Sequence, residues 1–265
     1  MSSHSGNNSI ENQTNMDNGE ASIMGEMVKK DLSYRIEGKI FNSLVVYRKE
    51  SSGLLPVVMV IPEWWGLNDF SIGKAEEYAE MGYFVLAMDF YGDRKSVETP
   101  EEAGSLAGPY YENSVYAKQV FDAGKNALKE FPNADLSSVA VVGYCFGGAM
   151  ALNMGRQDPQ LKAVISVHGN LMTGVKAKHS NVKFLVLNGQ DDTYVPREEV
   201  AAFKAEMESA QVDYVFIDYP GALHAFTNPA SDYYAEKFNL PIAYHEEATQ
   251  KSQNEIKAFL SKVLK

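Results

Sequence analysis

The stretch that decides the fold is "VAVVGYCFGGAM", residues 139–150, where an apolar run ends in a glycine-rich turn. It contains "GYCFG", residues 143–147, a pattern of the form G-x-C-x-G whose Cys145 is the only cysteine of the chain. The related pattern G-x-S-x-G places a nucleophile on a sharp strand-to-helix turn at the edge of an α/β sheet. The flanking glycines are needed because side chains there would collide with the neighbouring strand and helix. We therefore expect Cys145 to be a nucleophile.

The predicted position of Cys145 at a helix N-terminus also suits this chemistry. Unpaired N–H groups and the helix dipole favour a thiolate over a thiol, and they favour the oxyanion that forms when a thiolate attacks a carbonyl. The alternative interpretation is a small buried structural residue, because free cysteines are usually buried. The two glycines around the turn favour the nucleophile.

The rest of the chain alternates between short apolar runs and amphipathic segments, which predicts an α/β fold with a mostly parallel sheet covered on both faces. Strands are predicted at 33–39, 41–49, 55–62, 83–90, 139–144, 163–169, 183–189 and 213–220. Helices are predicted at about 70–82, 112–131, 146–157, 197–210 and 230–263. The first two strands, joined by Gly38, are expected to form an antiparallel hairpin at the N-terminal edge.

The N-terminal segment differs in composition from the remainder. Residues 1–26 are rich in Ser, Asn and Gly, and we expect them to form a disordered polar tail, with a single domain over 27–265. The tail lacks the basic start and apolar stretch of a signal peptide, so we expect a cytoplasmic protein. The alternative is an exported protein, for example a periplasmic one, whose signal is absent from this sequence.

Composition narrows the function classes. The formal net charge of −11 argues against nucleic acid as a partner, and no apolar run approaches the length of a membrane span. A single cysteine argues against a disulfide and a cysteine-rich metal site. Neither a dinucleotide-binding nor a phosphate-binding glycine motif occurs in the sequence. We therefore expect no metal, no cofactor and a small-molecule substrate.

A thiol with an ordinary pKa of about 8.5 needs a base, and in this fold an acid and then a histidine follow the nucleophile. The turn "LVLNGQDDTYVP" offers Asp191 and Asp192, and its spacing favours Asp192 as the acid. His224 in "YPGALHAF" follows the last predicted strand and is the expected base. His168 also ends a strand, but it precedes Asp192 and breaks this order.

The segment "IPEWWGLND", residues 61–69, follows the third predicted strand, where this fold usually supplies an oxyanion-binding N–H. A carboxylate from Glu63 beside Cys145 would disfavour the thiolate, because like charges repel. Glu63 is thus expected to keep Cys145 as an unreactive thiol until substrate displaces the Glu63 carboxylate. The alternative is that Glu63 faces water and that Trp64 and Trp65 cover the core.

Together, "PEWWG", "GYCFGG", "GQDDTYVP" and "GALHAF" resemble the dienelactone hydrolase family from about residue 30 to the C-terminus. The resemblance implies an α/β-hydrolase fold, usually monomeric and without a cofactor, with a triad of Cys145, Asp192 and His224. It also implies that Glu63 holds the resting thiol and that the N–H groups of Trp64 and Phe146 bind the oxyanion. The family reaction is hydrolysis of dienelactone (4-carboxymethylenebut-2-en-4-olide) to maleylacetate.

The sequence departs from the family at the substrate. The resemblance implies two arginines that grip the carboxylate of the lactone; Arg94 matches the first, but Asn228 stands at the position of the second. Loss of a charged hydrogen bond worth roughly 1.5–3 kcal/mol would weaken binding of that anion about ten- to a hundredfold. The alternative for Arg94 is a surface ion pair with Asp93 or Glu98. Trp65 and Tyr144 are also expected to contact substrate.

Three other functions fit parts of the pattern. The first is a carboxylesterase of the same fold with a different ester substrate. The second is a class I glutaminase, which also has a G-x-C-x-G turn and would use His245 and Glu247 of "YHEEA". The third is a non-catalytic binding module, although such proteins usually lose at least one member of the triad.

Overall fold

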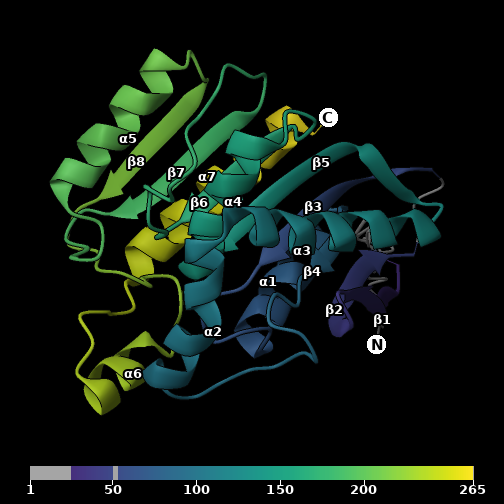
Figure 1. Ribbon diagram of the computed structural model, residues 1–265, viewed down its shortest axis with the longest axis horizontal. Helices are drawn as coiled ribbons and strands as arrows, with labels where there is room; N and C mark the ends of the chain where they lie inside the picture. Colours follow the sequence, from purple (N-terminus) through teal and green to yellow (C-terminus); the bar gives the residue numbers. More distant parts are fainter. Residues whose placement is uncertain (1–24, 50–52, 265) are drawn as a thin grey trace, which may run out of the picture.

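A computed structural model describes residues 25–49 and 53–264, whose strands form one eight-stranded sheet (Figure 1). The strand order is β1-β2-β4-β3-β5-β6-β7-β8. The strands are β1 (Met27–Ile36), β2 (Lys39–Arg48), β3 (Leu55–Ile61), β4 (Phe84–Ala87), β5 (Ala134–Tyr144), β6 (Ala163–Val167), β7 (Lys183–Gly189) and β8 (Tyr214–Tyr219). Strands β3 to β8 are mutually parallel, whereas β1 and β2 are an antiparallel hairpin and β2 pairs antiparallel with β4. The predicted α/β fold and edge hairpin are confirmed.

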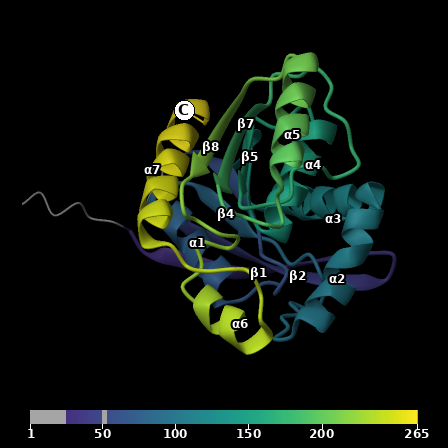
Figure 2. The same ribbon diagram turned by 90° about the vertical axis from the view of Figure 1, so that its left-hand side faces the viewer.

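Helices cover both faces of this sheet, because its central strands are apolar on both sides. They are α1 (Asp69–Glu80), α2 (Pro100–Glu112), α3 (Ser114–Ala127), α4 (Phe146–Gln157), α5 (Arg197–Ser209), α6 (Ser231–Phe238) and α7 (Glu246–Val263). Figure 2 shows α1 and α7 on one side and α3, α4 and α5 on the other. Side chains of β3 alternate between the two cores: Met59 packs toward the second group of helices and Val58 toward the first.

The predicted helices differ from the structure in two places, one wrong in extent and one missing. The segment 230–263 is not one helix, because Asn239 adopts a left-handed conformation (φ 53°) that ends α6, and Pro241 follows in the gap before α7. Helix α2 was not predicted, although Thr99 caps its N-terminus by accepting from the N–H of Glu102. Glycines and Pro109 within α2 obscure the helical pattern in the sequence.

The prediction of a disordered tail over residues 1–26 lies outside the described residues, apart from its last two positions. The described chain begins at residue 25, and the carbonyl of Glu26 already accepts a hydrogen bond from the N–H of Lys49 (3.1 Å). The division into one domain over 27–265 stays a prediction.

The turn between β5 and α4 leaves no room for side chains at Gly143 and Gly147. A Cβ added to Gly143 would lie 1.8 Å from the carbonyl oxygen of Gly147, and one added to Gly147 would lie 2.1 Å from the carbonyl oxygen of Ile61 in β3. Real Cβ atoms do not approach backbone this closely, so both positions require glycine. The predicted steric reason for the two glycines is therefore observed directly.

Replacing Gly143 by alanine is expected to destabilise the protein, because the clash is with backbone that cannot rotate away. Overpacking of this kind costs about 3 kcal/mol at the upper end of measured values. For a chain of this size that lowers the Tm by roughly 6–12 °C. The measurement is thermal unfolding followed by circular dichroism.

The matched control is Gly104→Ala in α2, where an added Cβ meets nothing within 4 Å. Alanine is favoured over glycine inside a helix by about 0.5–1 kcal/mol, so this variant should melt at or slightly above the wild-type temperature. A Gly143→Ala protein that melts like the wild type would show that the turn is not sterically constrained.

Candidate active site

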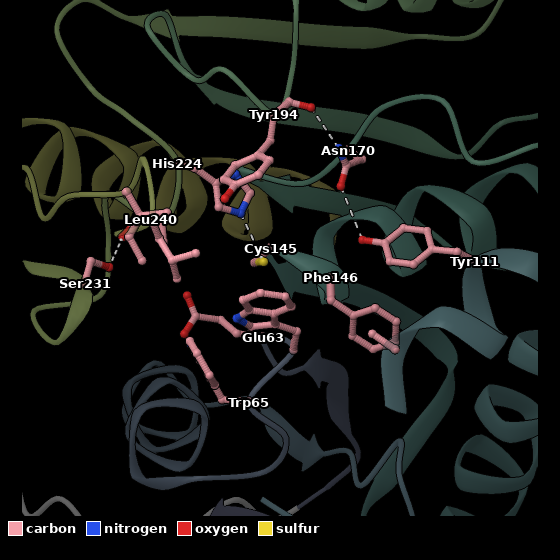
Figure 3. Close-up of a pocket in the computed structure, with 14 residues that line it drawn as sticks. Glu63, Trp65, Tyr111, Cys145, Phe146, Asn170, Tyr194, His224, Ser231 and Leu240 are labelled. Atoms are coloured by element: carbon pink, nitrogen blue, oxygen red, sulfur yellow. Dashed lines mark hydrogen bonds between the residues drawn. The ribbon is translucent and has the colours of Figure 1, made fainter. Parts of the chain in front are cut away.

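A cavity of about 210 Å³ lies beside the β5–α4 turn and is walled mainly by aromatic and aliphatic side chains (Figure 3). Its lining comes from the segment after β3, from α2, from the β5–α4 turn, from the loops after β6, β7 and β8, and from the start of α6 and the segment between α6 and α7. The lining residues are Glu63, Trp64, Trp65, Ala107, Tyr111, Cys145, Phe146, Asn170, Tyr194, His224, Ala225, Ser231, Leu240 and Ile242. Because parallel strands end at the same edge, residues far apart in sequence meet here.

Cys145 and His224 are joined by a hydrogen bond across this cavity. The Cys145 sulfur lies 3.1 Å from Nε2 of His224, and Nδ1 of His224 lies 2.8 Å from Oδ2 of Asp192. The backbone of Cys145 has φ 53° and ψ −115°, a conformation that L-residues rarely adopt, and the turn directs the sulfur into the cavity. The structure thus brings the three predicted side chains into one chain of hydrogen bonds.

The turn after β7 determines which aspartate reaches His224. Asp192 is buried, and its Oδ1 accepts from the N–H of Tyr194 (2.8 Å) while Oδ2 faces the imidazole. Asp191, one residue earlier, is exposed to solvent. With one oxygen fixed by backbone, the Asp192 carboxylate can turn only its other oxygen toward the ring, and this favours the tautomer with hydrogen on Nδ1.

His224 is held by the segment that follows it. The carbonyl of His224 accepts from the N–H of Ala243 (3.3 Å), and its ring packs against Tyr194 (5.1 Å between centroids) and His168 (5.5 Å). Burial alone lowers the pKa of His224, but the negative charges of the Cys145 thiolate and Asp192 outweigh burial and raise it to about 10. A positively charged His224 is therefore favoured at neutral pH.

His168 belongs to the site in a way that chain order did not reveal. It is fully buried at the end of β6, and its Nδ1 accepts a hydrogen bond from the backbone N–H of Cys145 (3.1 Å). Its Nε2 lies 2.8 Å from the hydroxyl of Thr227, so the ring is neutral with hydrogen on Nε2. Burial and the neighbouring His224 hold the pKa of His168 well below its usual value. His168 therefore contacts the backbone of the strained turn and not the Cys145 sulfur. In the sequence, its place at the end of a predicted strand was the one sign that it could reach the site.

Glu63 lies in the cavity wall but does not hold the thiol in this structure. Its Oε2 accepts from Nδ2 of Asn228 (2.6 Å), while the hydrogen-bond partner of the Cys145 sulfur is His224. The Glu63 carboxylate thus bonds to Asn228, which stands at the position of the second family arginine, and not to the Cys145 thiol. Burial raises the pKa of Glu63 to about 7, although Asn228 and the charges of His224 and Lys74 oppose the rise.

The residues predicted to flank the oxyanion are both placed at the cavity. Phe146 is the first residue of α4, and the N–H groups of a first helical turn lack partners within the helix. Trp64 also lines the cavity, and its carbonyl accepts from the hydroxyl of Tyr91 (3.0 Å). Trp65, predicted to contact substrate, also lines the cavity and stacks on Tyr234 of α6 at 4.4 Å.

Two predicted substrate contacts are not placed at the cavity. Nη2 of Arg94 pairs with Asp31 (2.6 Å), and its guanidinium also donates to the carbonyls of Asn42 and Ser43, so it fastens the edge hairpin. The ion pair is with Asp31 and not with the two acids expected as its surface partners. Tyr144 is buried on the opposite side of β5, where its hydroxyl lies 2.6 Å from that of Tyr78.

Within residues 25–49 and 53–264, no group of three or more His, Cys, Asp or Glu side chains is arranged to hold a metal ion. None of the helices in this same part of the chain combines the length and the apolarity that crossing a bilayer requires.

A sheet of this strand order, with a nucleophile-type turn after β5 and the acid and histidine after β7 and β8, defines the α/β-hydrolase fold. The sequence profile of the dienelactone hydrolase family matches residues 41–264. The chain therefore belongs to the dienelactone hydrolase family. This confirms the resemblance drawn from the four motifs and the predicted enzyme class, hydrolases of carboxylic esters and lactones.

Individual relatives agree with this assignment. "Protein usf" of Aquifex pyrophilus is 29% identical over 72% of this chain and 88% of that protein. A protein of Escherichia coli K12 named "Putative carboxymethylenebutenolidase" is 28% identical over 67% of this chain and 70% of that protein. The crystal structure of a dienelactone hydrolase-like promiscuous phosphotriesterase from metagenomic libraries has a TM-score of 0.82 and 27% identity, covering 91% of this chain and all of that one.

The buried carboxyl of Glu63 is expected to make stability depend on pH. Its pKa is about 7 in the folded protein against the usual 4.5, so the folded state binds this proton more tightly than the unfolded state does. Stability therefore falls as pH rises from about 4.5 to about 7, by about 3 kcal/mol in total. The glutamine of Glu63→Gln does not ionise, so the variant lacks this loss of stability. The difference in Tm, variant minus wild type, should therefore increase by roughly 6–12 °C between pH 4.5 and pH 8.

The control is Glu236→Gln, which makes the same change of charge at an exposed position on α6. Its Tm difference from wild type should stay nearly constant over that pH range. A constant difference for Glu63→Gln as well would mean that Glu63 ionises as freely in the folded protein as in the unfolded chain.

Proposed function

We propose that the protein hydrolyses a lactone or an activated carboxylic ester with Cys145 as nucleophile, His224 as acid and base, and Asp192 as the group that orients His224. The observation that carries this proposal is the pair of contacts at His224, 3.1 Å to the sulfur and 2.8 Å to the carboxylate. A small-molecule substrate fits the size of the cavity. The monomeric state and the cytoplasmic location stay predictions from the sequence.

The first step forms an acyl-enzyme. The Cys145 thiolate attacks the carbonyl carbon, and the carbonyl oxygen becomes an oxyanion that the N–H groups of Trp64 and Phe146 stabilise. Collapse of this intermediate breaks the carbon–oxygen bond of the ester, and the leaving oxygen takes the proton held on Nε2 of His224. The acyl group is then a thioester on Cys145, and in a lactone the leaving oxygen remains tethered to it.

The second step returns the enzyme to its starting state. His224, now neutral, accepts a proton from water, and the resulting hydroxide attacks the thioester carbonyl. Collapse expels the Cys145 thiolate beside the imidazolium and releases the carboxylic acid. Sulfur is itself expelled easily, so acylation succeeds best with a good leaving group such as an enolate or an aryloxide. An activated ester or an enol lactone is therefore the preferred substrate type.

The other functions considered from the sequence have less support. A glutaminase would need His245 at the sulfur, but the Nδ1 atom of His245 accepts from the N–H of Ala248 and caps helix α7. A non-catalytic binding module does not require the series of hydrogen bonds from Asp192 through His224 to Cys145. A carboxylesterase of the same fold shares the whole mechanism and differs only in substrate.

Replacing Cys145 by alanine is expected to lower kcat for an aryl ester or enol lactone at least about 10⁴-fold, because no nucleophile remains. The fold should be unaffected, so the Tm should stay within a few degrees of wild type. In parallel, a slowly deacylating aryl ester should add the mass of its acyl group to the wild-type protein and not to the variant. Turnover by Cys145→Ala at the wild-type rate would exclude this mechanism.

Asp192→Asn is expected to reduce kcat about 10²–10⁴-fold, because the amide removes the negative charge that supports the imidazolium and favours the wrong tautomer of His224. Asp191→Asn is the matched control, since it makes the same change one residue away at an exposed side chain. Its kcat should stay within about twofold of wild type. Equal losses in the two variants would assign the effect to the turn and not to the contact with His224.

A further inference from the structure

The charge of the cavity wall is the starting observation. Among the described residues that line it, Glu63 is the one carboxylate, and neither lysine nor arginine contributes. The arginine that the sequence suggested for anion binding, Arg94, is held by Asp31 on the edge hairpin. Apart from His224, whose imidazole is bonded to Cys145 and Asp192, the wall therefore offers no cationic side chain to a carboxylate on the substrate.

The Glu63 carboxylate also has an unused oxygen. The residue is 2% exposed, its Oε2 accepts from Asn228, and its Oε1 has no hydrogen-bond partner among the described residues. In Figure 3 the carboxylate lies between the side chains of Leu240 and Trp65, at the cavity surface. A buried acceptor without a partner is costly, and a donor that reaches it recovers this cost.

The neighbouring polar side chains of the wall are already engaged. The hydroxyl of Ser231 donates to the carbonyl of Ala225 (2.8 Å). The amide of Asn170 donates to the carbonyl of Tyr194 (3.0 Å) and accepts from the hydroxyl of Tyr111 (3.3 Å). Oε1 of Glu63 is thus the carboxylate oxygen of this wall that is buried without a hydrogen-bond partner among the described residues.

We propose that the substrate carries an uncharged or positively charged hydrogen-bond donor that binds Oε1 of Glu63, and that the site rejects substrates bearing a carboxylate at that place. This inference rests on the proposed hydrolase function and specifies its substrate class. A hydroxyl, an amide N–H or an ammonium supplies the donor, whereas a carboxylate would bring two negative charges together in a dry cavity. A site built around a buried hydrogen-bonding group discriminates strongly against ligands that cannot pair with it.

Three lactones with the same ring, which differ only in the substituent on the exocyclic carbonyl, test this proposal: dienelactone, its primary amide and its methyl ester. The amide matches the carboxylate in shape but is neutral and donates, while the ester is neutral and cannot donate. At pH 8, kcat/KM of the wild type should be about ten- to a hundredfold higher for the amide than for the carboxylate. The methyl ester should fall between them.

Glu63→Gln should reduce the preference for the amide over the carboxylate to about threefold or less, because the variant lacks the repelling charge and gains an N–H donor. Glu236→Gln, with the same change of charge outside the cavity, should keep the wild-type ratio. A wild-type enzyme that prefers the carboxylate, or that does not distinguish it from the amide, overturns the inference. So does an unchanged ratio in Glu63→Gln.

A binding measurement separates this inference from the proposed function. Calorimetric titration of the Cys145→Ala protein with the three lactones should give Kd values in the same order, with at least a tenfold difference between amide and carboxylate. If the wild type turns over none of the lactones in a Cys145-dependent way, the proposed function is wrong, and the Kd order still decides the charge preference of the cavity. Equal affinities, or no binding at millimolar concentrations, overturn the inference.

Discussion

The close approach of three backbone segments at the β5–α4 turn is the constraint on which the rest of the site depends. Gly143 faces the carbonyl of Gly147, and Gly147 faces the carbonyl of Ile61 at the end of β3. This contact brings the start of α4 against β3, so that the segment carrying Glu63 and Trp64 lies beside the sulfur. An extra methyl group at either glycine would clash with this facing backbone.

Electrostatics around Cys145 then set the protonation of the site. Asp192 and the thiolate stabilise positive charge on His224, while His168 is kept neutral by burial and by that same charge. The two histidines are packed at 5.5 Å yet have opposite roles, one facing the sulfur and one the backbone N–H of Cys145. Burial alone would have made both neutral; the difference comes from which of them lies next to negative groups.

The cavity wall departs from the family pattern at Asn228, which is bonded to Glu63. Where the family resemblance implied an arginine, Asn228 donates to one oxygen of Glu63 and leaves the other without a partner. An arginine at this place would neutralise the carboxylate and attract anions. Asn228 leaves the carboxylate without a cationic partner, and on this the proposed preference for donor-bearing substrates rests.

The sequence by itself determined the features that arise from local sterics and chain order. The two glycines around Cys145 predicted the turn, apolar runs predicted the parallel strands, and the order of Cys145, Asp192 and His224 predicted which loops carry them. Tertiary structure alone decided that Arg94 fastens the edge hairpin, that Tyr144 is buried against Tyr78, and that His168 contacts the nucleophile turn. The reason is physical: a tight turn depends on its own few residues, whereas the partner of a long polar side chain depends on which distant strand end lies beside it.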